Sequence, residues 1–308
     1  MRKVAIIDMG TNTFNLLIAS VDGHSSYKIL HSGKLGVKLG EGGINQKVIV
    51  PAAYERGLNA IGEHCQTVKR YGADSIYAFA TSATRNAENG EQFIADIQNI
   101  HGVTVQIIDG SEEAELVYLG IRQAVELDES NVLMLDIGGG SNEIIIGNRH
   151  ESVWRKSYDL GISRLLQMFN PSDPITSSEV LEVEAFLQEE LSDLAQHVSL
   201  YKPETIIGSS GSFDTYRSVL SANGAINGNG EPSIVMPMDA YFALHNRLIA
   251  TTAVERKAIP GMDAMRVEMI VLATIFTNYL IRRFDIKNMI QSSYALKEGA
   301  VWKMLNGN

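Results

Sequence analysis

The sequence has a single cysteine and no long uninterrupted apolar run, and both absences restrict what the protein can be. Cys65 cannot form an internal disulfide, so we expect a reducing compartment and predict a cytoplasmic location. No stretch approaches the roughly 18 apolar residues that a membrane-spanning helix needs. The apolar run that starts at Val4 reaches Asp8 within five residues. This indicates a buried strand rather than a signal peptide.

Positive charge is also scarce. There are 26 Lys and Arg residues against 36 Asp and Glu, and the formal net charge is -10. This balance argues against nucleic acid or an anionic membrane as a partner, but a local basic patch could still bind an anionic substrate. The length of 308 residues and a hydrophobic content of 45% suit two globular domains.

Short apolar runs alternate with longer amphipathic stretches, which predicts an α/β chain. We expect strands at 4–7, 15–20, 75–79, 103–108, 132–135, 144–146 and 204–207. Helices are expected at 52–71, 111–125 with Ser111 as cap, 177–198 with Ser177 or Ser178 as cap, and 264–284. The glycine-rich stretch 223–230 is predicted to be a surface loop.

One pattern occurs twice. A strand ends in Asp8, a turn with Gly10 and small polar residues follows, and a second strand begins; the same order recurs around Asp136 and Gly138. The two copies are about half of the chain apart, which predicts two related domains, 1–127 and 128–308, that face each other across a cleft.

The first of these turns is suited to phosphate. Asp8 could hold a metal directly or through water, and the turn offers backbone N–H groups together with hydroxyl and amide side chains. Its candidate binding residues are Gly10, Thr11, Asn12 and Thr13. An ordinary β-hairpin explains the same residues equally well.

The second turn carries a stronger signal. Three consecutive glycines cost roughly 0.5–1 kcal/mol each relative to Ala, so their presence indicates that the backbone passes close to something. Asp136 and Glu143 flank the turn, and both are candidate metal ligands. The candidate phosphate-binding residues between them are Gly138, Gly139, Gly140 and Ser141. A bulged hairpin with solvated ends is the structural alternative.

Three further segments follow predicted strands. Small residues at Gly208, Ser209, Ser210, Gly211 and Ser212 could cradle a phosphate or nucleotide at a helix start, or Ser212 could simply cap that helix. Glutamates in the first turn of the 111–125 helix could accept a proton from an attacking water, although acids are also favoured there by the helix dipole. Arg85 could clamp a phosphate, or could be a solvated surface arginine.

Taken together, these motifs resemble the phosphate and adenosine motifs of the actin–hexokinase superfamily. Within it, five segments are similar to the exopolyphosphatase and guanosine pentaphosphate phosphatase family, in its short, two-domain form. They are 7–13, 80–85, 110–114, 135–141 and 161–164, and the similarity continues through 256–261 and 296–299.

The resemblance implies two ribonuclease H-like domains, as in actin-like ATPases, with an interdomain cleft. It implies that Glu113, rather than Glu112, is the general base, and that Arg85 contributes to catalysis. It further implies that Asp136, Glu143 and Asp8 are associated with Mg²⁺ or Mn²⁺. Asn142 and the tripeptide at 293–295 depart from the pattern of many members and leave the substrate preference open.

We therefore expect a phosphatase that hydrolyses terminal phosphoanhydride bonds of inorganic polyphosphate by metal-assisted attack of water, with guanosine pentaphosphate as a second candidate substrate. An ATP-dependent kinase of the same superfamily is one alternative. A weakly catalytic regulator that binds polyphosphate or guanosine tetraphosphate is the other, and a homodimer is one expected assembly. Because the net charge is negative, a local basic lining is needed. At least three of five residues should face the cleft, namely Lys34, Lys38, Arg85, Arg164 and Lys297.

Overall fold

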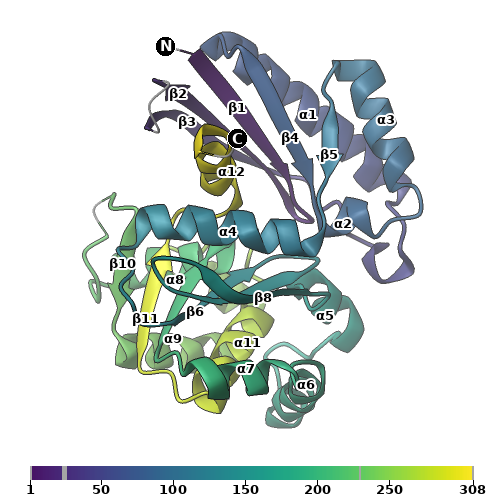
Figure 1. The fold of residues 1–308 in the computed structure, drawn as a ribbon. Helices are drawn as coiled ribbons and strands as arrows, with labels where there is room; N and C mark the ends of the chain where they lie inside the picture. The colour runs from purple at the N-terminus through teal and green to yellow at the C-terminus, as the bar shows by residue number, and fades with distance from the viewer. Residues whose placement is uncertain (1, 23–25, 229, 307–308) are drawn as a thin grey trace.

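The chain folds into two mixed α/β lobes stacked on each other (Figure 1). The structure, a computed structural model, describes residues 2–22, 26–228 and 230–306. Within these ranges no helix combines the length and apolar character needed to cross a bilayer. We call the unit built on the first sheet the first lobe (residues 2–107) and the unit built on the second sheet the second lobe (residues 132–292).

The sheet of the first lobe has five strands in the order β3-β2-β1-β4-β5. The antiparallel part is made by β1 (Arg2–Met9), β2 (Thr13–Val21) and β3 (Tyr27–Gly36), and β4 (Ser75–Ala80) and β5 (Val105–Ile107) add to β1 in parallel. The remaining elements of this lobe are η1 (Ile44–Gln46), α1 (Pro51–Tyr71), α2 (Ser82–Arg85) and α3 (Gly90–His101).

The sheet of the second lobe repeats this topology. Its order is β10-β11-β9-β6-β7-β8, in which β6, β7 and β8 are antiparallel and β9 and β11 continue from β6 in parallel. The strands are β6 (Val132–Ile137), β7 (Asn142–Gly147), β8 (Ser152–Tyr158), β9 (Thr205–Ser209), β10 (Ser233–Met236) and β11 (Asn288–Ser292). β10 adds antiparallel to β11 and has no counterpart in the first sheet, but the other five strands have the same order and directions in both lobes, which confirms the predicted pair of ribonuclease H-like units.

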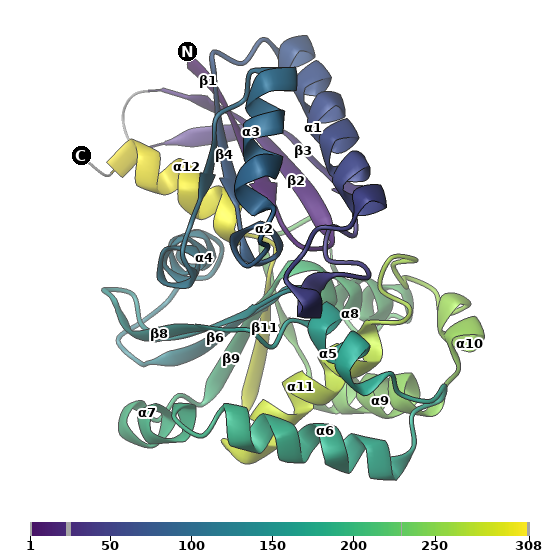
Figure 2. The same cartoon turned by 90° about the vertical axis from the view of Figure 1, so that its right-hand side faces the viewer.

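Helices cover the second sheet on the face away from the first lobe. They are α5 (Ile162–Phe169), α6 (Ser177–Glu190), α7 (Leu194–Tyr201), α8 (Ser210–Ala222), α9 (Met238–Ala250) and α11 (Ile270–Arg283). The short α10 (Ala253–Lys257) lies at the edge of this lobe (Figure 2). The strongly buried α11 packs against α6 and α9 and forms the centre of this layer.

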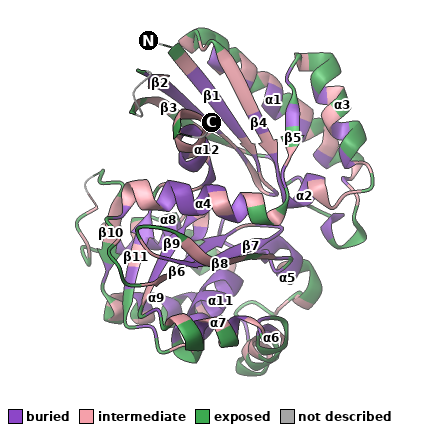
Figure 3. Cartoon of the chain, viewed as in Figure 1, coloured by how far each residue is buried: buried purple, intermediate pink, exposed green. Residues whose placement is uncertain are grey.

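Two helices join the lobes. In Figure 2, α4 (Gly110–Ala124) lies between the sheets, and α12 (Leu296–Asn306) lies beside it along the first sheet. They share one apolar cluster, to which the first sheet contributes Ile6 and the second contributes Met134 and Ile145. Figure 3 shows the buried middle of α4 that results. The last helix of the 128–308 range therefore packs against the first lobe, and the chain crosses between the lobes twice.

Several expected helix ends differ from the structure. The helix expected at 111–125 begins at Gly110, because the Asp109 carboxylate accepts from the Glu112 N–H at 2.8 Å and caps it instead of Ser111. Thr176, in a capping box, replaces Ser177 or Ser178 as the cap of α6.

Two predicted helices are shorter than expected. The 177–198 helix is divided into α6 and α7, and α11 begins at Ile270 rather than at 264. Ser212 lies within α8, which starts after Ser209. Residues 223–228 and 230 form the predicted loop, and residue 229 lies outside the described residues.

Candidate active site

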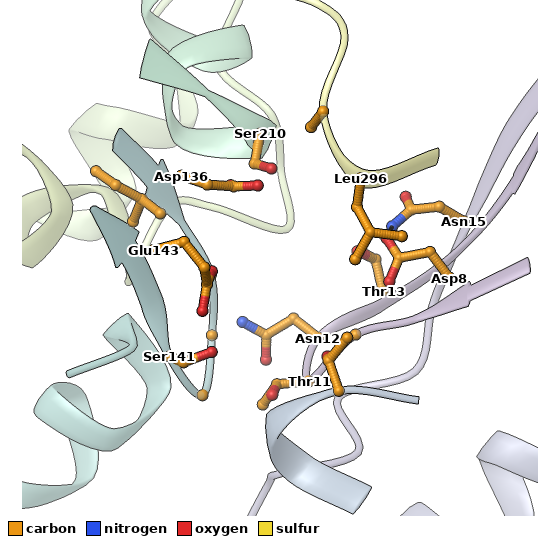
Figure 4. Close-up of a pocket in the computed structure, with 18 of the residues that line it drawn as sticks. Asp8, Thr11, Asn12, Thr13, Asn15, Asp136, Ser141, Glu143, Ser210 and Leu296 are labelled. Atoms are coloured by element: carbon orange, nitrogen blue, oxygen red, sulfur yellow. Dashed lines mark hydrogen bonds between the residues drawn. The ribbon is translucent and has the colours of Figure 1, made fainter. Parts of the chain in front are cut away.

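A cavity of about 130 Å³ lies between the lobes, and most of the predicted site residues line it. We call it the central cavity. Figure 4 shows Asp8 and Asn15 on one side of it and Asp136 and Glu143 on the other. The predicted residues that reach it are Asp8, Gly10, Thr11, Asn12, Thr13, Glu113, Asp136, Gly138, Gly139, Gly140, Ser141, Glu143, Ser210 and Gly211.

The two turns are built in the same way. In each lobe the first glycine donates its N–H to the carbonyl three residues later, from Gly10 to Thr13 and from Gly138 to Ser141, both at 3.1 Å. Across the ladder Asp136 pairs with Glu143, and Asp8 pairs with Asn15. The repeat therefore places a carboxylate and a second polar side chain from each lobe at the mouth of its sheet.

Two glycines of the second turn, Gly139 and Gly140, make room for the first turn, whereas a Cβ at Gly138 would meet the carbonyl oxygen of Ser141 in its own turn. A Cβ at Gly139 would lie 2.5 Å from Nδ2 of Asn12, and a Cβ at Gly140 would lie 2.5 Å from Oγ1 of Thr11. The Asn12 side chain is held in place by the Ser163 hydroxyl, which donates to its Oδ1 at 2.9 Å. Glycine is required at these positions because the two lobes meet here. The sequence predicted that the backbone passes close to another group, and the structure shows that this group is the first turn.

Only part of the 208–212 segment belongs to the candidate site. Ser210 has a positive φ of 67°, which is uncommon for a residue with a side chain, and its hydroxyl hydrogen-bonds Asp136. Gly208 instead packs under a ring, because a Cβ there would lie 2.0 Å from Phe213. Of this segment, only Ser210 and Gly211 line the central cavity; the buried Ser209 and Ser212 do not.

Glu113 is buried in the first turn of α4 and faces the cavity, whereas Glu112 lies outside, 3.5 Å from Lys303. Nη1 of Arg85 donates to Oε2 of Glu113 at 2.8 Å and also to the carbonyl of Ile108 at 2.9 Å. Burial raises the pKa of Glu113 to about 7, although Arg85 lowers it. A carboxylate with a pKa near neutrality can gain and lose a proton under physiological conditions.

The other carboxylates repel one another in a dry environment. Burial raises the pKa of Asp136 to about 6, against the Ser210 hydrogen bond. Burial and the charges of Glu113 and Asp136 raise the pKa of Glu143 well above its usual range, although its Oε1 accepts from Ser157 at 2.7 Å. Burial also raises the pKa of Asp8. A cation bound among these groups would relieve both effects.

The residues present fit a divalent cation. Five carboxylates line the central cavity, from Asp8, Glu113, Asp136, Glu143 and Asp214, against three cations, from Lys34, Arg266 and Lys297. Buried Oδ1 of Asp136 has no hydrogen-bond partner in the described part of the chain. The described residues contain no ready-made cluster of three metal-ligating side chains. Mg²⁺ does not need one, because it keeps several waters and takes one or two carboxylates together with substrate phosphates.

The predicted basic lining is only partly present. Lys34 and Lys297 line the central cavity, and Lys38 lines a second hollow whose walls come from both lobes, so three of the five residues face the space between the lobes but only two reach the central cavity. Arg85 turns to Glu113, and Arg164 is buried with its Nε donating to the carbonyl of Gly140 at 2.7 Å. Lys38 lies in a different hollow, 3.9 Å from Glu41. Arg85, Arg164 and Lys38, which we expected to bind substrate, instead interact with carboxylate or carbonyl oxygens of the protein.

Sequence reasoning also missed residues that line the central cavity, among them Asn15, Arg266 and Asp214. Asn15 could have been found, because the repeat places it where the second lobe has Glu143. Arg266 comes from the segment before α11 and Asp214 from within α8, and neither has a local pattern that indicates a site.

The geometry can now be compared with known proteins. A family model described as the Ppx/GppA phosphatase family matches residues 17–307. The chain belongs to this family. Membership confirms the resemblance carried by the five sequence segments, and it makes the chain a phosphatase by class.

Relatives in the Ppx/GppA family support the same assignment. Exopolyphosphatase 1 of Mycobacterium tuberculosis is 27% identical over 310 residues, which cover 99% of this chain and 88% of the relative. The crystal structure of an exopolyphosphatase from Cytophaga hutchinsonii is 32% identical, covers 99% of this chain and 98% of that one, and superposes with a TM-score of 0.95. The Aquifex aeolicus family member, at 24% identity and a TM-score of 0.80 over 99% of this chain and 97% of its own, has the same fold.

Proposed function

We propose that the protein is an exopolyphosphatase, which removes terminal phosphoryl groups from inorganic polyphosphate by attack of water. The observation that carries the proposal is the buried Glu113 carboxylate, which faces two phosphate-type turns across a cavity and has a pKa near neutrality. Membership of a phosphatase family and the names of the mycobacterial and Cytophaga relatives support the substrate class.

In the proposed reaction, a water oxygen attacks the terminal phosphorus while the bond from that phosphorus to the bridging oxygen breaks. The bridging oxygen leaves with the shortened chain, and Glu113 accepts the proton of the water. Backbone N–H groups of the 10–13 and 138–141 turns, together with Lys297 and Arg266, stabilise the charge on the phosphoryl oxygens.

The metal is part of this proposal. Asp136, Glu143 and Asp8 are the residues that would hold Mg²⁺ or Mn²⁺, which would supply charge neutralisation to the phosphate oxygens. Without such a cation, three basic side chains would face five carboxylates and a polyanion in one cavity. We therefore expect chelation to abolish activity and added Mg²⁺ to restore it.

The two alternatives make different demands on Glu113. A kinase would use a carboxylate to accept a proton from an organic hydroxyl, and a binding regulator would need no proton acceptor at all. The burial of the Glu113 carboxylate favours a small acceptor such as water. Guanosine pentaphosphate stays a second candidate substrate of the same reaction, and the reducing cytoplasm stays the predicted location.

The proposal is tested by phosphate release from polyphosphate, tripolyphosphate, guanosine pentaphosphate and ATP, with and without a hexose acceptor. We expect release from polyphosphate by the wild type and a loss of about 10²–10⁴-fold in Glu113→Gln. Glu112→Gln, the neighbouring residue on the outer face of α4, is the matched control and should keep its activity. Normal turnover by Glu113→Gln, or phosphate transfer to hexose instead of water, would contradict the proposal.

A further inference from the structure

An ion pair joins the two lobes beside the central cavity. Lys34 extends from β3 of the first lobe, and its Nζ lies 2.7 Å from Oδ2 of Asp263, which precedes α11 in the second lobe. Lys34 lines the cavity, and so does Arg266, three residues after Asp263. The Lys34 side chain is 48% exposed, whereas that of Lys297 is 17% exposed, so Lys34 marks the solvent side of the cavity.

Asp263 is held in the position that it needs for this contact. Its Oδ1 accepts from the backbone N–H of Met265 at 2.9 Å, and its carbonyl accepts from the N–H of Arg266 at 2.8 Å. Lys34 and the Met265 N–H lower the pKa of Asp263, and the carboxylate stays charged at neutral pH. The ammonium group of Lys34 is thus paired with a carboxylate that the backbone holds in place.

The two inner cations of the cavity lie among several carboxylates without a close ion pair, because Lys297 is 3.9 Å from Glu298 and the buried Nε of Arg266 has no hydrogen-bond partner among the described residues. Lys297 interacts with Glu298, Asp8, Asp214 and Asp136, and Arg266 interacts with Asp263 and Asp214. Lys34 has one close acidic partner, and that partner is only 24% exposed on a backbone-fixed turn. A polyanion that enters past Lys34 has one cation to gain there and one carboxylate to displace.

We propose that Asp263 is an internal competitor for substrate: it holds Lys34 until a phosphoryl group behind the terminal one takes its place. The inference rests on the proposed function for the identity of the polyanion. A phosphoryl group carries charge on several oxygens, and the Lys34 ammonium, with a side chain 48% exposed, is screened enough by solvent for such a group to displace Asp263. Lys34 and Asp263 together would then favour chains over single phosphates.

The proposal is tested with Asp263→Asn, which keeps the acceptor for Met265 and removes the charge. Binding of tripolyphosphate and of inorganic phosphate is measured by calorimetry with Mg²⁺ in the non-hydrolysing Glu113→Gln background, alongside KM for phosphate release in the otherwise wild-type protein. We expect Asp263→Asn to tighten tripolyphosphate binding and lower KM by about two- to fivefold, with little effect on inorganic phosphate. Lys34→Ala should weaken tripolyphosphate binding, and Asp263→Asn should add nothing to Lys34→Ala.

The remote Lys156–Asp193 pair, at 2.6 Å and with a lysine of similar exposure, provides the control. Asp193→Asn should leave both affinities unchanged. Weaker binding in Asp263→Asn would overturn the proposal, because the pair would then be a clamp that substrate needs. Equal tightening by Asp263→Asn with and without Lys34 would also overturn it, since the effect would be long-range repulsion. If no variant releases phosphate but Asp263→Asn still tightens tripolyphosphate binding, the proposed hydrolysis fails while the competition stands.

Discussion

At the scale of single residues, the protonation of Glu113 is set by two opposing effects, burial and the charge of Arg85. Burial keeps a proton on the carboxyl group, and the Arg85 guanidinium at 2.8 Å favours the charged form. The result is a pKa of about 7. Because a general base must be ionised before it accepts a proton, this balance determines the pH range in which the proposed reaction can run.

We therefore expect kcat/KM for polyphosphate to rise with pH as Glu113 loses its proton, at or below the pKa of about 7 that Glu113 has without a cation. The profile is measured by phosphate release between about pH 5 and 9 at saturating Mg²⁺. The residual activity of Glu113→Gln should lack this acidic limb. Persistence of the limb in Glu113→Gln would show that another group titrates in the profile.

Arg85→Ala tests the effect of Arg85 on the pKa of Glu113. Removing Arg85 takes away the charge and the hydrogen bond that lower the pKa of Glu113, so that pKa should rise and the acidic limb should move to higher pH. Activity at pH 7 should fall on every substrate and partly recover at alkaline pH. Arg149→Ala, an exposed arginine paired with Glu129, is the control and should leave the profile unchanged. A uniform loss with an unshifted limb would mean that Arg85 acts directly on substrate.

At the scale of elements, α4 and α12 cross at close range, and glycine permits this approach. A Cβ at Gly120 would lie 1.9 Å from the carbonyl oxygen of Ala295, and a Cβ at Gly299 would lie 1.8 Å from that of Leu116. Glu113 lies two turns before Gly120 on α4, and Lys297 lies in the first turn of α12. The crossing thus fixes one proposed base and one phosphate-site cation relative to each other.

Gly120→Ala should destabilise the protein by about 1–3 kcal/mol or more, because backbone at the crossing cannot move aside. Gly62→Ala is the matched control within α1, since the Cβ there would meet only the ring of His101 at 3.0 Å. Alanine in a helix interior is favoured over glycine, so Gly62→Ala should leave stability unchanged or raise it by up to about 1 kcal/mol. Denaturant unfolding gives both values, and equal stability of the two variants would contradict the importance of the crossing.

The elements themselves show what the sequence could and could not predict. The 177–198 stretch was predicted as one helix because buried Val183, Leu187, Leu191, Leu194 and Val198 keep a helical spacing throughout. The first helix nevertheless ends at Glu190 and a second begins at Leu194, and the apolar spacing continues across the turn between them. Periodicity reports which side is buried, and it is insensitive to a short turn that preserves that side.

The prediction of the site was limited in the same way, because local patterns can be recognised in a sequence and long-range contacts cannot. Asp8, Asp136 and the glycines of both turns were predictable because each turn is local and the repeat identifies it twice. The direction of Arg85 was not, because it depends on Glu113, a partner 28 residues away that the fold brings to 2.8 Å. Contacts of this kind, like the Lys34–Asp263 pair between lobes, have no signature in the residues on either side.

At the scale of the whole molecule, the fold gathers five carboxylates between two lobes of a protein with a net charge of -10. The pKa values of Glu113 and Asp136 rise to about 7 and about 6, from 4.5 and 3.8. The folded state therefore binds more protons than the unfolded state between about pH 4 and 7. Their contribution to stability is fully present below the unfolded pKa values and is lost as pH rises through the folded ones.

The metal-free protein should accordingly become less stable between pH 5 and 8, by on the order of 4 kcal/mol, because the pKa values of Glu113 and Asp136 lie about two units and about one unit above pH 5 and one unit corresponds to about 1.4 kcal/mol. Mg²⁺ should raise Tm more at pH 8 than at pH 5, because protons and the cation compete for the same carboxylates. The measurement is thermal unfolding at both pH values, with chelator and with Mg²⁺. In the double variant Glu113→Gln, Asp136→Asn, the decline with pH and the response to Mg²⁺ should both shrink, because the charges that drive them are gone. A Tm of the chelated wild type that rises from pH 5 to 8, or an equal Mg²⁺ effect at the two pH values, would show that these carboxylates are not the cation site.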